Sequence, residues 1–304
     1  MRLNSLQEVA EWLEFAPQNL YYLVAMRDEL YVPASIPKRS SGGYRRIYIP
    51  NSELKGVQRE LLRRILYQWD VNSRAYAYVP GRSLYQAAER LSGDKAVLQI
   101  DIKDFFPSIS SGRVYRLFCR RGFSYSASYV LTNLVTFKDK LTQGAPTSPY
   151  LSNLLVSGMD TWLSRFARAW GLEYLRYSDD LFFYGPQDFS HKTFAPYAHR
   201  IINRYGLRVN RKKQAYHPRG KPRFTLGLAT HGVHPQIPRA KRRRIRAAFY
   251  NGSKNPEWAA KRVDELTGLA EWYRSVYGTD ERYADYRKVI DNVRSTRFHE
   301  PFTV

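Results

Sequence analysis

Two adjacent carboxylates, Asp179 and Asp180, lie in the middle of a run of strand-forming residues. The run extends from Leu175 to Tyr184 with apolar or aromatic residues on both sides of the pair, which predicts two strands meeting at a tight turn. Asp is a common turn residue, so one interpretation is a hairpin tip in solvent. Such tips usually carry Gly or Asn, and these flanks are very apolar. The alternative is a buried hairpin that binds a divalent metal ion, and these residues alone leave the choice open.

A second strand-like run, residues 96–102, carries Asp101 near its end. Apolar residues on both sides of Asp101 favour a central strand. A carboxylate at the end of a buried strand is costly unless it is paired or ligates a metal ion. The nearby Asp104 fits a helix cap or a salt-bridged acid better. Asp101, Asp179 and Asp180 therefore form a candidate metal-binding set, which the fold must bring together.

The chain is strongly basic, with a net charge of +22 from 49 Lys and Arg against 27 Asp and Glu. Such a charge needs a polyanionic partner, with nucleic acid as the leading candidate and an anionic membrane surface as the alternative. No stretch approaches the ~20 apolar residues of a membrane span, and no signal-peptide pattern is present. The single Cys119 excludes an internal disulfide framework. We therefore expect a cytoplasmic protein with no membrane partner.

A Gly-rich turn separates two strand-like runs near the N-terminus, at residues 31–38 and 44–49. Their spacing predicts a β-hairpin. Both arms are basic, through Lys38, Arg39, Arg45 and Arg46. Cationic side chains on two arms of one hairpin can bind a phosphate chain. A solvated edge hairpin is the alternative.

Most of the remaining chain predicts helices. Residues 3–28 indicate two helices interrupted at Pro17, and a long helix is expected from Tyr150 to about Trp170. The polar loop 141–149 precedes that helix, and its small residues allow a backbone or a nucleotide to approach closely. An ordinary helix entry is the alternative reading of the loop. Residues 223–229 predict a strand interrupted by a glycine.

The last part of the chain, residues 239–304, is expected to be helical and basic. Its densest charge cluster comprises Arg239, Lys241, Arg242, Arg243, Arg244 and Arg246. Such a cluster suits binding of a duplex or an RNA stem, and a solvated helix face is the alternative.

These features converge on phosphate chemistry. Mg²⁺ prefers a few carboxylates together with substrate phosphate oxygens. Two such ions ~4 Å apart can activate an attacking 3′-hydroxyl and stabilise a leaving pyrophosphate. The candidate carboxylates and the basic charge therefore indicate metal-assisted nucleotidyl transfer.

The chain resembles the reverse transcriptases over roughly residues 30–235, specifically their bacterial retron-type and defence-associated branch. Five motifs follow in the family's order, which is far more specific than any one of them. They are the stretch Gln99–Ser108 around Asp101, the loop Gln143–Pro149 with Leu151–Asn153, Tyr177-Ser178-Asp179-Asp180, Gly206–Lys213, and Leu226-Gly227-Leu228.

The resemblance implies an α+β right-hand polymerase in which an antiparallel palm sheet is backed by helices. We expect an N-terminal helical extension at 1–29, fingers at 30–95 and a palm at 96–238 with a helical insertion at about 111–140. A basic helical thumb would occupy 239–304.

The resemblance also implies roles for individual residues. Asp101, Asp179 and Asp180, with the backbone carbonyl of Ile102, would hold two Mg²⁺ ions, and Mn²⁺ is the alternative ion. Lys213 would protonate the leaving pyrophosphate, although Lys212 competes for this role. The residues expected to bind the nucleotide are Lys38, Arg45, Phe106, Gln143 and Gly144. Those expected to bind nucleic acid are Gly227, Arg242, Arg243, Arg244 and Arg246.

Phe106 matches the family's bulky position beneath the sugar, where a large ring would exclude a 2′-hydroxyl and select deoxynucleotides. A core aromatic is the alternative role for Phe106. The implied activity is RNA-directed DNA synthesis on an associated structured noncoding RNA, which serves as template and as a candidate primer. A DNA product, an effector-protein partner and a role in antiphage defence follow by analogy.

Two departures from the retron pattern leave open which RNA is bound. Residues 86–90 read Gln-Ala-Ala-Glu-Arg where retron enzymes carry Asn-Ala-x-x-His, and residues 225–227 read Thr-Leu-Gly where they carry Val-Thr-Gly. Two other functions remain open: a template-independent or RNA-synthesising polymerase of the same fold, and a catalytically silent RNA-binding protein.

Overall fold

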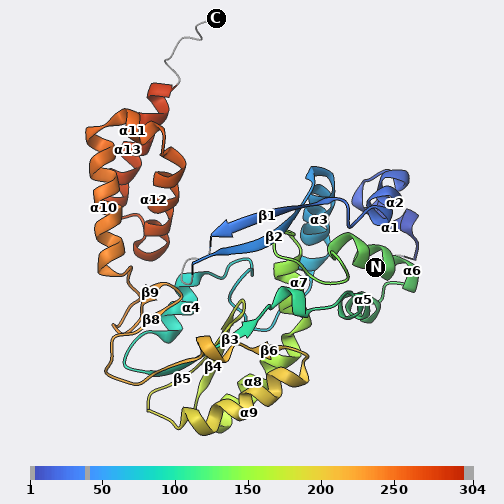
Figure 1. The fold of residues 1–304 in the computed structure, drawn as a ribbon, viewed down its shortest axis with the longest axis horizontal. Coiled ribbons are helices and arrows are strands. Elements are labelled where there is room, and N and C mark those ends of the chain that lie inside the picture. Colours follow the sequence, from blue (N-terminus) through green and yellow to red (C-terminus); the bar gives the residue numbers. More distant parts are fainter. Residues whose placement is uncertain (1–3, 38–41, 298–304) are drawn as a thin grey trace, which may run out of the picture. The chain divides into compact units, whose positions relative to one another are not determined.

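The computed structural model describes residues 4–37 and 42–297 and divides into two compact units. The first unit comprises Met1–Ser83 and Val97–Tyr216, and the second comprises Leu84–Ala96 and His217–Val304. Figure 1 traces the elements of both units along the chain. The expected division into fingers, palm and thumb stays a prediction, and residues 84–96 group with the C-terminal part of the chain.

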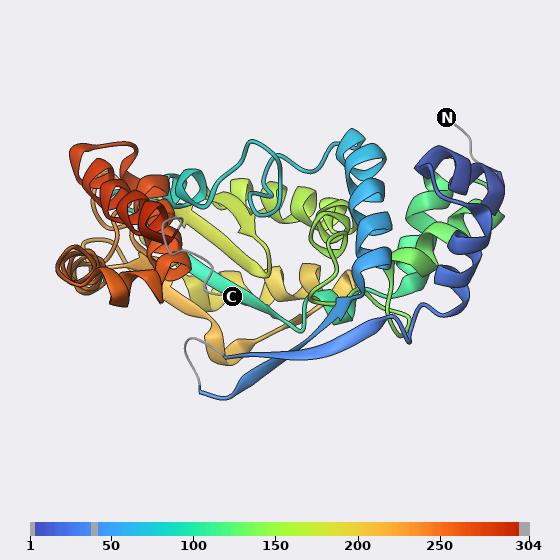
Figure 2. The same ribbon diagram turned by 90° about the horizontal axis from the view of Figure 1, so that it is seen from above.

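The first unit begins with two short helices, α1 (Leu6–Leu13) and α2 (Pro17–Ala25). Ser5 caps α1 by accepting a hydrogen bond from the Glu8 amide at 3.1 Å. Pro17 is the first residue of α2, where its missing N–H costs nothing, so the predicted interruption at Pro17 is confirmed. Figure 2 shows these two helices beside α5 (Ser111–Arg120) and α6 (Tyr125–Val135), drawn in green.

A long hairpin follows, formed by β1 (Tyr31–Pro37) and β2 (Tyr44–Pro50), as the sequence predicts. The strands are antiparallel, with pairing from Tyr31↔Pro50 to Pro37↔Tyr44. Arg45 lies on β2, and Lys38 lies outside the described residues. The hairpin leads into α3 (Ser52–Arg64), which the Asn51 side chain caps at the Leu54 amide, and then into the short turn η1 (Leu66–Gln68).

The central sheet of the first unit has the strand order β4-β5-β3-β6, and β7 also pairs with β3. Its strands are β3 (Ala96–Lys103), β4 (Glu173–Tyr177), β5 (Asp180–Gly185), β6 (Arg208–Val209) and β7 (Ala215–His217). The pairs β4–β5 and β3–β6 are antiparallel. This mixture of helices with an antiparallel sheet confirms the predicted α+β class.

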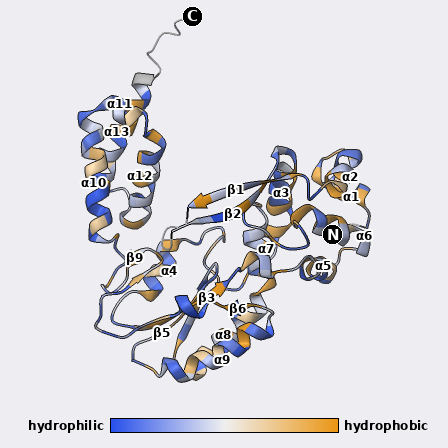
Figure 3. Cartoon of the chain, in the orientation of Figure 1, coloured by the Kyte–Doolittle hydropathy of each residue, from blue (hydrophilic) through white to orange (hydrophobic). Residues whose placement is uncertain are grey.

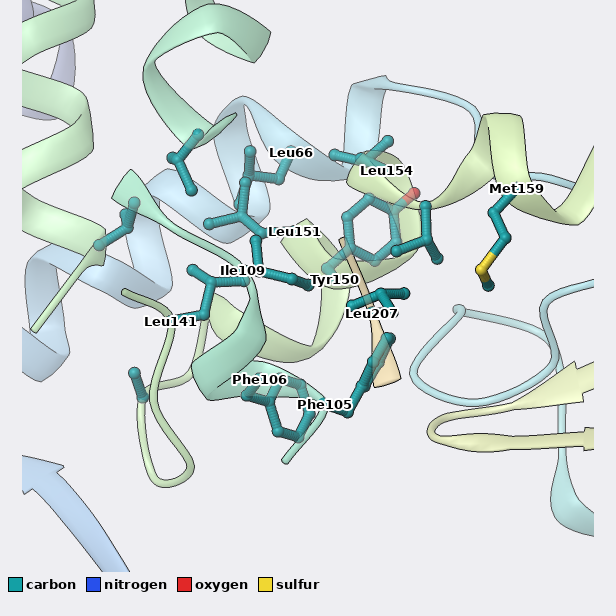
Figure 4. Close-up of a cluster of buried hydrophobic side chains, with 14 of the residues drawn as sticks. Leu66, Phe105, Phe106, Ile109, Leu141, Tyr150, Leu151, Leu154, Met159 and Leu207 are labelled. Carbon is teal, nitrogen blue, oxygen red and sulfur yellow. The ribbon is translucent and has the colours of Figure 1, made fainter. Parts of the chain in front are cut away.

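Two helices cover one face of this sheet, α8 (Ser157–Ala169) against β4 and α9 (His191–Arg204) against β6 (Figure 1). The core beneath them continues into a cluster around the turn η2 (Phe106–Ser108), shown in Figure 4. Phe105, Phe106, Ile109 and Leu141 meet there with residues of α7, among them Leu151. The cluster fixes the chain segment that leaves β3 just after Asp101.

The expected single helix from Tyr150 to Trp170 is instead two helices, α7 (Ser148–Leu155) and α8. The interruption falls at Val156, where φ is −103° and ψ is 6°. Ser157 and Gly158 follow, and both residue types are weaker helix formers than Ala. Gly158 also lies close to Tyr205, because a Cβ on this glycine would be 2.9 Å from the Tyr205 hydroxyl.

The second unit contains α4 (Leu84–Leu91) and the C-terminal helices α10 (Arg239–Lys254), α11 (Pro256–Ala260), α12 (Val263–Tyr277) and α13 (Glu281–Arg297). These helices have their own core, in which the rings of Phe249 and Tyr286 stack at 4.0 Å. Hydrophilic residues predominate along α10 in Figure 3. The described residues 239–297 thus form mainly helices, as expected, and their role as a basic thumb stays a prediction.

The strand predicted at 223–229 is a small hairpin of β8 (Phe224–Thr225) and β9 (Leu228–Ala229). Its two-residue loop has positive φ at both positions, 53° at Leu226 and 80° at Gly227. Such a loop reverses the chain where a single strand was expected. The neighbouring Arg223 is buried and donates to the carbonyl oxygens of Leu91, Gly93, Lys95 and Thr230, which fixes the hairpin to the segment after α4.

Among the described residues, no helix combines the length and the apolar character that a membrane span requires.

Candidate active site

The strand β3 places Asp101 in the middle of the sheet. Its residues are buried on both faces, and Asp101 itself is only 5% exposed. The main-chain carbonyl of Asp101 accepts a hydrogen bond from the Asn210 amide at 2.8 Å. A neighbouring strand therefore fixes the backbone of Asp101. The nearby Asp104 is exposed and has a φ of 49°, and its carbonyl accepts from the Ser108 amide.

The hairpin of β4 and β5 carries the other two carboxylates. Tyr177 pairs with Asp180, so Ser178 and Asp179 form a two-residue loop. The Asp179 carbonyl accepts a hydrogen bond from the Ile102 amide at 2.9 Å. This single main-chain bond joins the loop to the residue that follows Asp101. The structure therefore brings the Asp179–Asp180 pair next to Asp101, which precedes Asp179 by 78 positions in the sequence (179 − 101).

The loop holds Ser178 in a strained backbone conformation. Its φ is 60°, a region that non-glycine residues rarely adopt. Two contacts keep it there: the Tyr78 hydroxyl lies 3.0 Å from the Ser178 hydroxyl, and Arg176 donates to the Ser178 carbonyl at 3.1 Å. Tyr78 also has a positive φ, of 64°. The turn is therefore held by its surroundings.

Arg176 is the centre of the network behind this turn. Its side chain and that of Asp160 are both fully buried, and the guanidinium binds both carboxylate oxygens at 2.8 and 2.7 Å. Arg176 also donates to the Asn153 side chain at 2.9 Å. Tyr174 donates its hydroxyl to Asp160 at 2.8 Å. Burial lowers the pKa of Arg176, but the adjoining Asp160 carboxylate reverses this and raises it overall.

The main chain of Arg176 is also fixed. Its amide donates to the Arg74 carbonyl at 2.7 Å, and its carbonyl accepts from the Tyr76 amide at 2.8 Å. Asn153 in turn donates its side-chain amide to the Ala77 carbonyl. The segment 74–78, α7, α8 and the hairpin of β4 and β5 thus meet at Arg176. The apolar run around Arg176 gave no specific sign of this role.

The three carboxylates repel one another in a buried setting. Burial raises the pKa of Asp180 to about 6, and the charges of Asp179 and Asp101 act in the same direction. A hydrogen bond from Gln99 to Asp180, at 2.9 Å, opposes this shift. Lys213 donates to Asp101 at 2.8 Å, and this bond raises the pKa of Lys213.

Within the described residues, no three His, Cys, Asp or Glu side chains are already arranged around a common point for a metal ion. Asp101 faces Lys213 and Asp180 faces Gln99 instead. The donor set still suits Mg²⁺, because it consists of crowded, mutually repelling carboxylates that a divalent cation would neutralise. The Ile102 amide donates a hydrogen bond to the Asp179 carbonyl. Metal binding by the Ile102 carbonyl stays a prediction.

The residues expected to bind a nucleotide lie in the first unit. Arg45 is exposed on β2. Burial raises the pKa of Tyr78, and the charge of Arg45 opposes this with a smaller effect. Phe106 is 7% exposed, with its ring centroid 6.3 Å from that of Tyr78. Gln143 and Gly144 lie at the hairpin of β1 and β2, where the Gln143 carbonyl accepts from the Tyr48 amide at 2.9 Å. Their roles in binding stay predictions.

The residues expected to bind nucleic acid lie in the second unit. Gly227 occupies the loop of the β8–β9 hairpin, and a Cβ there would lie 3.8 Å from Lys241 Nζ. Arg243, Arg244 and Arg246 are exposed on α10, and Arg242 is half-buried. Their solvent exposure fits the prediction without testing it.

We expect substitution of Gly144 by Ala to detach the 143–144 loop from β2. Gly144 has a φ of 110°, and a Cβ there would lie 2.3 Å from the Tyr48 carbonyl oxygen. The Tyr48 amide should lose its protection from hydrogen exchange. Gly56 on α3 has open space where a Cβ would lie. Gly56→Ala should therefore keep the protection of the Tyr48 amide and raise the free energy of unfolding by about 0.5–1 kcal/mol. Unchanged protection at Tyr48 in Gly144→Ala would contradict this reading.

Asp160→Asn leaves the charge of Arg176 buried without its partner. We expect the free energy of unfolding to fall by about 3–5 kcal/mol, measured by denaturant unfolding of the full chain. Asp139→Asn is the matched control, because Asp139 pairs with Arg27 at 3.4 Å and its side chain is 78% exposed. That control should change stability by less than about 1 kcal/mol. Equal losses of unfolding free energy in the two variants would show that the buried pair contributes no more to stability than the exposed pair.

Comparison with known proteins agrees with this geometry. The family model "Reverse transcriptase (RNA-dependent DNA polymerase)" matches residues 36–229. The retron Ec86 reverse transcriptase of Escherichia coli is 30% identical over 250 residues, which cover 82% of this chain and 78% of that protein.

Two relatives from Myxococcus xanthus are longer. The retron Mx65 reverse transcriptase is 32% identical over 277 residues (85% of this chain, 64% of the relative), and the retron Mx162 enzyme is 30% identical over 306 residues (88% and 63%). The chain thus spans just under two thirds of these two relatives. From the family match and these relatives, the chain belongs to the reverse transcriptase family, in its retron-type branch.

Proposed function

We propose that the chain is an RNA-directed DNA polymerase that copies an associated structured noncoding RNA by two-metal nucleotidyl transfer. The observation that carries this proposal is the main-chain bond from Ile102 to Asp179, which holds the catalytic hairpin beside Asp101. Family membership supports the reaction type. The three relatives described above are retron reverse transcriptases, which supports a dedicated RNA template.

In this mechanism Asp101, Asp179 and Asp180 would hold two Mg²⁺ ions, with Mn²⁺ as the alternative. When bound, the ions lower the pKa of the primer 3′-hydroxyl and stabilise the charge on the leaving pyrophosphate. Asp101 would be available to an ion once its bond with Lys213 is released, and the Lys213 ammonium would stay beside the site. From there Lys213 could bind the triphosphate. Protonation of the leaving pyrophosphate by Lys213 stays a prediction.

Other residues of the chain position the substrates. Arg45, with Lys38 outside the described residues, would bind the triphosphate from the hairpin of β1 and β2. Phe106 would lie against the sugar, since its ring is fixed between the cluster of Figure 4 and Tyr78. Gln143 and Gly144 would lie along the nucleotide, and α10 with the Gly227 loop would hold the template and its DNA product.

The wider role follows from resemblance. A retron-type enzyme acting in the cytoplasm with its own RNA and an effector protein would serve in antiphage defence. Loss of protection against phage in cells with an inactive Asp179 variant would support this role, and full protection would contradict it.

The main test of the reaction is Asp179→Asn. Its charge is needed at the metal ions, so we expect DNA synthesis on a primed RNA template to fall by at least about a thousandfold, since removing an essential charged group costs several kcal/mol. RNA binding should persist. Asp139→Asn changes the same charge on a distant loop and should retain activity. If Asp179→Asn keeps all cellular activity while RNA binding persists, the protein acts as a catalytically silent RNA-binding protein instead.

Phe106→Val tests the choice of sugar. A smaller side chain would admit a 2′-hydroxyl, so we expect the preference for deoxynucleotides to fall by at least about tenfold. Phe105→Val is the matched control, because Phe105 is equally buried and adjacent, and it should keep the preference. The ratio of kcat/KM for dGTP and GTP measures this. If wild-type protein prefers ribonucleotides, or needs no template, an atypical polymerase is indicated.

A further inference from the structure

A pocket of about 460 Å³ lies over the helices that cover the sheet, and none of the residues assigned to the active site lines it. Its walls are Trp162 of α8 and four residues in or next to the end of α9, namely Arg200, Ile201, Arg204 and Tyr205. The volume falls in the range of small-ligand sites. Such a pocket can hold a nucleotide-sized group.

The floor of the pocket is built from fixed parts. The Tyr205 hydroxyl lies over Gly158, where any Cβ would be 2.9 Å away, so the glycine makes room for the ring. Arg113 of α5 donates to the Tyr205 carbonyl at 2.9 Å and to the Leu155 carbonyl at 3.1 Å. These two bonds hold the end of α9 against the junction of α7 and α8. The Trp162 side chain is left 55% exposed above this floor.

Two of the residues that line the pocket, Arg200 and Arg204, are cationic. The exposed charged side chains of α8 and α9 are all basic: Arg165, Arg168, Lys192, Arg200 and Arg204. The carboxylate of these two fully described helices, Asp160, is buried and paired with Arg176. Neither Arg200 nor Arg204 forms an ion pair with any described residue. The Arg200 guanidinium lies over the Tyr197 ring, 5.5 Å from its centroid.

We propose that this pocket binds an unpaired segment of nucleic acid. One base stacks on Trp162, and Arg200 and Arg204, one helical turn apart, bind the phosphates on either side. Exposed aromatic faces combined with arginines are the usual means of binding unpaired strands. An acidic peptide would satisfy the two arginines but would leave the indole face unused. The site acts as an anchor for RNA or DNA, and it does not depend on the polymerase proposal.

The test measures binding of a labelled unpaired oligoribonucleotide of about ten residues to the full chain by fluorescence anisotropy over a series of salt concentrations. We expect Trp162→Ala to weaken binding by about tenfold with no change in salt dependence. Trp162→Phe, which keeps a stacking face, should recover most of the affinity. Arg200→Gln with Arg204→Gln should lower the slope of log K against log salt by about 1.4.

The matched control is Arg116→Gln with Arg120→Gln, because these exposed arginines have the same spacing on α5. It should leave the affinity within about twofold. Equal losses in the two double variants would overturn the proposal in favour of a general electrostatic effect. Unchanged binding in Trp162→Ala would also overturn it.

Two further readouts locate the ligand. Ultraviolet cross-linking followed by peptide mass spectrometry should recover peptides containing Trp162 or Tyr205, and their absence would overturn the proposal even if a variant misfolds. A parallel measurement with a deoxyoligonucleotide distinguishes RNA from DNA as the ligand. Binding that depends on Trp162 for at least one of the two oligonucleotides supports the site. Binding that depends on Trp162 for neither contradicts it. If poly-glutamate displaces the oligonucleotide as well as unlabelled strand does, the pocket is a site for an acidic protein instead.

Discussion

The buried ion pair between Arg176 and Asp160 is the constraint on which the catalytic geometry depends. Taking both charges out of water is expensive, and the pair is tolerated because both carboxylate oxygens and several guanidinium donors are satisfied. In return, one side chain links α7, α8 and the strained turn at Ser178. A hydrophobic pair could fill the same volume but could not bind the Ser178 carbonyl. The polar pair thus sets the position of the turn.

This arrangement explains how reactive carboxylates can be held close together. Asp101, Asp179 and Asp180 repel one another, so their backbone must be fixed by contacts elsewhere. The Ile102–Asp179 and Asn210–Asp101 bonds do this from the sheet, and the Arg176 network does it from behind. Lys213 and Gln99 neutralise part of the repulsion through Asp101 and Asp180. In the proposed mechanism, Lys213 and Gln99 would release the two carboxylates for the metal ions.

The local parts of this site could be predicted from the sequence. Alternating strand formers around Asp179 gave the hairpin, and an apolar run on both sides of Asp101 gave the central strand. Arg176 and Asp160 were not predicted as a pair, because an arginine in a strand and an acid in a helix give no sign that they face each other. The sequence indicated only that each residue lies next to an apolar neighbour that is buried in the structure, Met159 for Asp160 and Leu175 for Arg176.

Other features that the sequence did not reveal have similar causes. The hairpin at 224–229 was missed because Leu226 adopts a positive φ that its residue type disfavours. The interruption at Val156 depends on Gly158 packing beneath Tyr205, a residue distant in the sequence. The grouping of 84–96 with the C-terminal part depends on Arg223 binding the carbonyls that follow α4. Such long-range contacts leave no periodic pattern.

The central claim is that the three aspartates together bind two metal ions for nucleotidyl transfer. A crystal structure with Mn²⁺, a primed RNA template and a non-hydrolysable deoxynucleotide tests it most directly, through anomalous scattering. We expect two manganese peaks about 4 Å apart, bound by carboxylate oxygens of Asp101, Asp179 and Asp180, with Lys213 displaced from Asp101. Peaks bound by other residues, or an intact bond between Lys213 and Asp101 with the substrates in place, would contradict it.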